Sequence, residues 1–152
     1  MKLVEQLPKK YDIKLITDTW NDIKSQLTED DWFDTGNGFK VSIQHKGVAS
    51  YTEGCGWMLD SESDYIYINP LFKDTIFEEI INDFGGFRAR MLVMNSKSVY
   101  AVHQDRGKRI HLAIESNDSS FFVFPKEEEV YHIPVDGHLY KVDTSKFHTF
   151  FN

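Results

Sequence analysis

The spacing of apolar residues predicts a short helix near the N-terminus. Apolar side chains recur at three- and four-residue steps at Ile16, Trp20, Ile23 and Leu27. This period places them on one face of a helix, and Thr17 or Asp18 can cap its start. We therefore expect an amphipathic helix over residues 17–27. The first 15 residues keep no sustained period and are predicted to form an irregular arm or an edge strand.

A second helix is predicted from Asn69 to the Gly85-Gly86 pair. Asn69 can act as the N-cap, and Pro70 stands at a position where a missing N–H costs nothing. The apolar face of this helix comprises Leu71, Phe72, Ile76, Phe77, Ile80, Ile81 and Phe84. Between the two helices, the alternation over residues 41–45 and 64–68 predicts strands. The small, polar stretch 47–56 is expected to be a mobile loop. With Trp57 included, this loop is expected to cover the functional site.

After Gly86 the sequence changes to short β-rich runs separated by turn residues. The runs are 88–95, 99–104, 109–115, 121–124, 130–133, 138–142 and 147–151. Several short strands at this spacing are typical of an antiparallel sandwich or barrel. We therefore expect a mainly β fold with flanking helices.

Length and composition narrow the class of protein. The 152 residues fit one domain spanning residues 1–152, and 41% apolar with 14% aromatic residues can fill a core. A formal charge of −7 disfavours nucleic acid as a partner. No apolar run approaches the roughly 20 residues of a membrane span, no signal-peptide pattern opens the chain, and Cys55 has no disulfide partner. These features predict a cytoplasmic location, no membrane partner and a spectator role for Cys55.

The histidines point to a metal site. Five of the six lie within the last 50 residues, and one of them forms the triplet His103-Gln104-Asp105. On a strand, residues two apart share a face about 6.6 Å apart, so an imidazole and a carboxylate can converge on one ion. His148, which opens the last β-rich run, is the best second histidine. Two histidines and one carboxylate form the facial set that suits non-haem Fe(II). We assign His132 and His138 to structure or solvent.

The arginines suggest an anionic ligand. All four lie within 22 residues that bracket the triplet, at Arg88, Arg90, Arg106 and Arg109. A guanidinium group matches a carboxylate bidentately, so this concentration predicts an anionic cosubstrate. Arg109 and His111 repeat the two-residue step on the next run and could face the same cavity.

From Arg90 to Asn152 these residues follow an ordered pattern: His103-Gln104-Asp105, then Arg109-Ile110-His111, then Asp143 to His148, and finally Asn152. This pattern resembles the aspartyl/asparaginyl β-hydroxylase family of Fe(II)- and 2-oxoglutarate-dependent oxygenases. The resemblance implies a double-stranded β-helix (a jelly-roll, cupin-like fold) in residues 88–152, against which a mixed, helical part over residues 1–87 packs.

The resemblance also implies the activity and the roles of the site residues. His103, Asp105 and His148 would hold Fe(II) as the catalytic metal, while Arg109 and His111 would contact the cosubstrate 2-oxoglutarate. The expected enzyme is a dioxygenase that uses 2-oxoglutarate and O2 to hydroxylate an amino-acid side chain, free or in a peptide.

The sequence departs from the family at its end. Family members usually continue past the distal histidine with a strand whose arginine grips the far carboxylate of 2-oxoglutarate, whereas this sequence stops at Asn152. Three explanations stay open: Arg88 or Arg90 replaces that arginine, a further strand follows, or cosubstrate binding is lost.

Two other functional classes are therefore kept. One is a catalytically silent jelly-roll that binds a small carboxylate or a protein partner. The other is a cupin-like enzyme with another metal, which the missing second histidine after His103 disfavours.

Overall fold

The computed structural model describes residues 2–152 and divides them into two compact units. The first unit contains the described residues up to Lys14 together with Asn95–Asn152, and the second is Leu15–Met94. Within the described residues the fold is mainly β, with 11 strands in antiparallel sheets and two α-helices, which confirms the coarse prediction of a mainly β fold that also contains helices.

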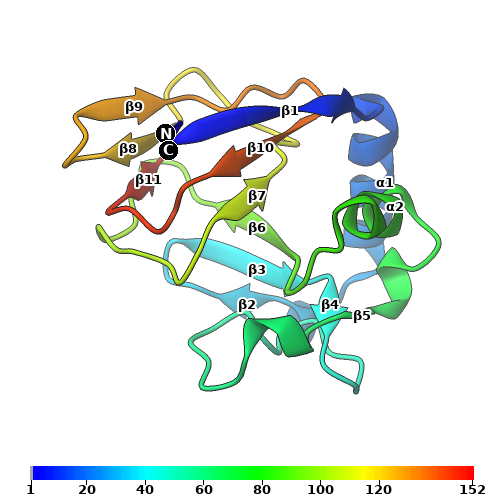
Figure 1. The fold of residues 1–152 in the computed structure, drawn as a ribbon. Coiled ribbons are helices and arrows are strands. Elements are labelled where there is room, and N and C mark those ends of the chain that lie inside the picture. The colour runs from blue at the N-terminus through cyan, green and yellow to red at the C-terminus, as the bar shows by residue number, and fades with distance from the viewer. Residues whose placement is uncertain (1) are drawn as a thin grey trace. The chain divides into compact units, whose positions relative to one another are not determined.

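The first unit contains two three-stranded antiparallel sheets (Figure 1). One sheet has the order β1 (Val4–Lys10), β10 (His138–Val142), β7 (Arg109–His111). The other has the order β11 (Thr149–Phe151), β8 (Phe121–Phe124), β9 (Glu129–Tyr131). Strand β1 is therefore an edge strand, one of the two forms predicted for the N-terminal arm.

The two sheets of the first unit share one hydrophobic core. Strand β10 contributes Tyr140 and Val142, and strand β8 contributes Phe122 and Phe124. In each pair the two residues are two positions apart and so point to the same side of their sheet. Both Val142 and Phe124 are fully buried. One predicted metal ligand, His148, packs against Phe122 and Phe124 of this core.

The second unit combines both helices with short strands. One sheet has the order β2 (Phe33–Asp34), β3 (Gly38–Ser42), β6 (Arg90–Met94), and β4 (Gln44–His45) pairs with β5 (Tyr67–Ile68). Helix α1 (Ile13–Gln26) buries Ile16, Trp20 and Ile23, the periodic residues of the predicted helix. Its Trp20 stacks on Phe72 at 6.4 Å between ring centroids. The run predicted at 88–95 thus pairs within this unit, because β6 lies beside β3.

The second predicted helix is split into two pieces. Pro70–Phe72 form a 3-10 turn, and α2 (Ile76–Phe84) begins at a new N-cap, Thr75, whose hydroxyl accepts from the Phe77 N–H. The break follows from Asp74, whose φ of 59° is incompatible with a continuous right-handed helix. Gly85 ends α2 in the left-handed conformation, as the sequence predicted.

The loop over residues 47–57 is tied down within the second unit. Cys55 is buried, and burial raises the pKa of its thiol. The Arg88 side chain donates to the carbonyl oxygens of Gly54 and Gly56 and pairs with Glu62. These bonds give no support to a mobile cover, and they occupy the guanidinium that the sequence offered as a cosubstrate ligand.

Among the described residues 2–152, neither α-helix combines the length and the hydropathy that crossing a membrane requires.

A polar network anchors the start of β10. Asp136 accepts from the Tyr140 hydroxyl at 2.7 Å and from the His138 N–H at 2.9 Å. Burial alone would raise the pKa of Asp136, but these hydrogen bonds and the His138 ring together lower it. Burial and the same carboxylate raise the pKa of Tyr140 to about 12.

Replacing Asp136 by Asn is expected to lower the free energy of unfolding at pH 7 by about 1 kcal/mol. The folded-state pKa of this carboxyl lies below the unfolded value of about 3.9, so its charged form stabilises the fold above that pH. The contribution disappears as the pH falls through the folded-state pKa. Urea unfolding from pH 7 to pH 3 should therefore show wild type and variant converging below about pH 4. Asp118→Asn, at an exposed turn, is the control; a difference independent of pH would contradict this role.

Candidate metal centre

The site is built on a single pair of residues from distant parts of the chain. The predicted strand 99–104 is absent as a regular element, but Val99 and His103 each form an isolated antiparallel bridge, with Phe151 and His148 respectively. The His103 N–H donates to the His148 carbonyl at 3.0 Å, and the His148 N–H donates back at 2.9 Å. Residues paired in this way point to the same face of the ladder. Their imidazole centroids lie 4.5 Å apart.

Each imidazole is oriented by its own backbone. His103 Nδ1 lies 2.7 Å from the Ala101 carbonyl oxygen, and His148 Nδ1 lies 2.9 Å from that of Lys146. Because a carbonyl oxygen can only accept, Nδ1 carries the proton in both rings. In the neutral ring this leaves the lone pair on Nε2, which is the state that binds a metal ion.

The carboxylate of Asp105 faces both Nε2 atoms. One oxygen lies 4.0 Å from His103 Nε2, and the other lies 3.9 Å from His148 Nε2. The second oxygen is also 3.5 Å from Arg109 Nε, which keeps positive charge beside the carboxylate. The structure therefore brings together the three side chains that the sequence proposed as ligands, with Arg109 next to them.

The donor set fits a divalent transition ion. One donor atom from each of the three residues lies within 4.8 Å of the others, a grouping that could hold a metal ion. Ligands at right angles around an ion with bonds of about 2.1 Å lie about 3 Å apart, so binding requires the side chains to draw in by roughly 1 Å. His103 can make this adjustment, because its side chain is 46% exposed.

The site is open on one side and closed on the other. The His148 side chain is 5% exposed, and Phe122 and Phe124 lie with ring centroids 6.4 and 6.2 Å from its own. Core packing therefore fixes one ligand, while the His103 side faces solvent. An arrangement of this kind holds an ion from one face and leaves coordination positions for other molecules.

The two residues predicted to bind a cosubstrate lie in different surroundings. Arg109 and His111 both belong to β7, opposite Val142 and Tyr140 of β10. Arg109 reaches Asp105, whereas the His111 ring packs edge-on against Phe122 at 5.0 Å. The geometry places Arg109 at the candidate centre and His111 against the core.

The other candidate residues of this unit have structural contacts. His132 bonds the Ser120 carbonyl through Nδ1, and His138 contacts Asp136. Asn152 accepts hydrogen bonds from the side chains of Asn117 and Ser120, which ties the chain end to a neighbouring turn.

Sequence reasoning missed the contribution of the turn 143–146. The Asp105 N–H donates to the Thr144 carbonyl, and Gln104 Nε2 donates to the Ser145 carbonyl, both at 2.8 Å. The turn residues Asp, Thr and Ser were visible in the sequence, but a turn composition does not say which distant loop it holds.

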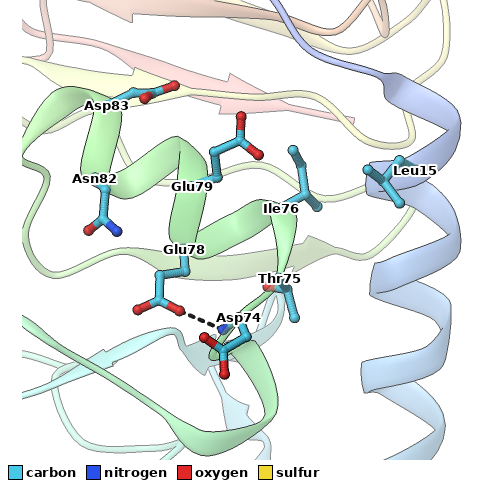
Figure 2. A pocket seen from close by; sticks show the side chains of 8 residues that line it. All are labelled: Leu15, Asp74, Thr75, Ile76, Glu78, Glu79, Asn82 and Asp83. Atoms are coloured by element: carbon cyan, nitrogen blue, oxygen red, sulfur yellow. Dashed lines mark hydrogen bonds between the residues drawn. The ribbon is translucent and has the colours of Figure 1, made fainter.

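A separate hollow in the second unit is acidic and offers no comparable donor set. It has a volume of about 590 Å³ and is lined mainly by the outer face of α2, with Glu78, Glu79 and Asp83 among its residues (Figure 2). Glu78 accepts from the Asp74 N–H at the start of this face. The described histidines do not line it.

The chain matches no protein-family model, and no curated protein is significantly similar to it.

We expect the wild-type chain to bind one divalent transition ion, measured by equilibrium dialysis or calorimetry with Co(II). His103→Ala and His148→Ala each remove one of three ligands and should weaken binding more than about 100-fold, beyond the effect of losing an outer-shell partner. His132→Ala is the matched control, because this exposed imidazole bonds a carbonyl elsewhere in the same unit. Circular dichroism checks the fold. Stoichiometric Co(II) in either ligand variant would contradict the assignment.

Proposed function

We propose that this protein is an Fe(II)- and 2-oxoglutarate-dependent dioxygenase that hydroxylates an amino-acid side chain, free or within a peptide. The observation that carries the proposal is the His103–Asp105–His148 grouping, with both Nδ1 atoms bonded to carbonyl oxygens and both Nε2 atoms directed at one carboxylate. Two imidazoles and one carboxylate on a face with open positions match the requirement of this iron chemistry.

Bound iron would supply the activation of O2, coupled to the oxidative decarboxylation of 2-oxoglutarate, that hydroxylates an unactivated C–H bond. The chain's own residues would bind the ion through two Nε2 atoms and one carboxylate oxygen. Phe122 and Phe124 would keep water away from the His148 side. Arg109 would balance charge at Asp105 and hold an anion beside it.

Charge near the site supports an anionic cosubstrate. The ligand-bearing segments 103–111 and 143–148 carry four cations, Arg106, Lys108, Arg109 and Lys146, against the two carboxylates of Asp105 and Asp143, although the whole chain has a net charge of −7. Cations beside a dication repel it unless an anion lies between them. A carboxylate bound at the metal would lie between the ion and these cations and reduce that repulsion, and Arg109, which contacts Asp105, is placed to pair with it.

The strand arrangement of the first unit supports a jelly-roll. The bridges at Val99 and His103 add the segment 99–103 beside β11, so this layer has the order 99–103, β11, β8, β9. It shares its core with the layer β1, β10, β7. Two antiparallel layers that share one core are a feature of the jelly-roll, whose full set is eight strands in two sheets.

The runner-up is a catalytically silent jelly-roll that binds a small carboxylate or a protein partner. The contact between Arg109 and Asp105 favours it, because this ion pair satisfies the carboxylate without a metal. The two functions differ in a simple way: the enzyme makes succinate, and the silent protein does not.

Anaerobic addition of Fe(II) and 2-oxoglutarate should give a visible charge-transfer band, and admission of O2 should give succinate. Arg109→Ala is expected to raise the 2-oxoglutarate concentration for half-saturation about 10- to 100-fold, since a charge-assisted hydrogen bond contributes about 1.5–3 kcal/mol, and to change Fe(II) affinity much less. Lys97→Ala, which removes an exposed cation at a turn of the first unit outside the ligand-bearing segments, is the control.

One result would count against the enzyme, and another against the role of Arg109. Binding of 2-oxoglutarate without succinate under O2, across a panel of amino acids and peptides, would favour the silent binder. Equal loss of Fe(II) and 2-oxoglutarate in Arg109→Ala would indicate misfolding rather than a cosubstrate contact.

A further inference from the structure

The three candidate ligands are not held with equal firmness by the backbone. His103 and His148 fix each other through two main-chain hydrogen bonds. Asp105 lies two residues further on, outside every strand and bridge, in the loop 104–108. Its position relative to the imidazoles must therefore come from other contacts of that loop.

Thr144 supplies two of those contacts from the opposite side. Its carbonyl oxygen accepts from the Asp105 N–H at 2.8 Å, and its hydroxyl donates to the Gly107 carbonyl at 2.5 Å. The residue is 1% exposed. One buried side chain and its own carbonyl thus hold the loop on both sides of the Asp105 carboxylate.

Thr144 can hold the loop because its own turn is fixed. The Asp143 N–H donates to the Leu3 carbonyl at 2.8 Å, and the Lys146 N–H donates to the Asp143 carbonyl at 3.2 Å. Asp143 is 2% exposed and accepts from the Ser145 hydroxyl through Oδ1. The turn continues from β10, whose Val142 is fully buried, and leads four residues later to His148. The turn 143–146 therefore fixes the loop 104–108 relative to the core strands.

We infer that Thr144 is a positioning residue for the metal centre: through its hydroxyl and carbonyl it sets where the Asp105 carboxylate lies relative to the two imidazoles. The inference rests on the proposed metal site and adds a residue that contacts no metal. Without the hydroxyl, the Gly107 carbonyl loses its donor and the loop is held by fewer bonds. The carboxylate is then less often in place, while the histidine pair is unchanged.

The test compares Thr144→Val, which keeps the shape and removes the hydroxyl, with Thr144→Ser, which keeps the hydroxyl. Co(II) affinity is measured by calorimetry, and the Co(II) absorption spectrum reports the ligand set. Thr144→Val should bind Co(II) about 10- to 100-fold more weakly, as outer-shell variants do. Its spectrum should shift toward that of Asp105→Ala. The Co(II) affinity of Thr144→Ser should stay within about threefold of the wild-type value, because serine retains the hydrogen bond to the Gly107 carbonyl.

Thr75→Val is the matched control for stability. Thr75 also donates its hydroxyl to a carbonyl, that of Phe72, and caps α2 in the second unit. The Thr75→Val substitution should lower the melting temperature, because it removes the N-cap of α2, and should leave Co(II) affinity unchanged. If Thr144→Val does not fold, Gln104→Ala loosens the same loop from its exposed side by removing the bond to Ser145. Gln104→Ala should weaken Co(II) binding about 3- to 10-fold, which is less than the effect expected for loss of the buried Thr144 hydroxyl.

The outcomes distinguish a failure of the positioning role from a failure of the metal centre. If wild type binds Co(II) and both Thr144→Val and Gln104→Ala bind it equally well, the positioning role is wrong and the metal centre stands. If Thr144→Ser binds as weakly as Thr144→Val, the hydroxyl is not the cause, and the inference is again wrong. If wild type itself takes up no Co(II), the metal centre fails, and this inference fails with it.

Discussion

The candidate site depends on the reciprocal pair of main-chain hydrogen bonds between His103 and His148. These two bonds join residues 45 positions apart in the sequence and fix both imidazoles on one face of the ladder. Hydrogen bonds to the turn 143–146 hold the Asp105 loop beside this pair, and the carbonyl partners of both Nδ1 atoms leave Nε2 available.

The core explains why the pairing forms at that register. Strand β11 follows His148 directly, and its Phe150 pairs with Phe122 of β8, which belongs to the core shared by the two sheets. A shift by one residue would turn Phe150 outward and carry His148 to the other face. The hydrophobic pattern of the last strand therefore also sets the orientation of a polar ligand. Packing and site geometry are two consequences of one register.

Local pattern predicted the elements whose determinants are local. Strands β8 and β10 match the predicted runs 121–124 and 138–142, because alternation and flanking turns define them. The prediction of one continuous helix from Asn69 was wrong, because the chain breaks at Asp74. The period of the apolar residues does not reveal the left-handed conformation of that residue. The triad could be proposed from residue types and spacing, but the hold of Thr144 on the Asp105 loop could not. That contact joins two loops 39 residues apart, and no periodicity encodes it.

The most direct test of the metal centre is a crystal of the protein loaded with Co(II), with anomalous diffraction measured at the cobalt absorption edge. We predict one anomalous peak per chain, within about 2.0–2.2 Å of His103 Nε2, His148 Nε2 and one Asp105 oxygen, with the remaining coordination positions facing the exposed His103 side. A fully occupied ion bound elsewhere, or no ion at these three side chains at saturating Co(II), would contradict it.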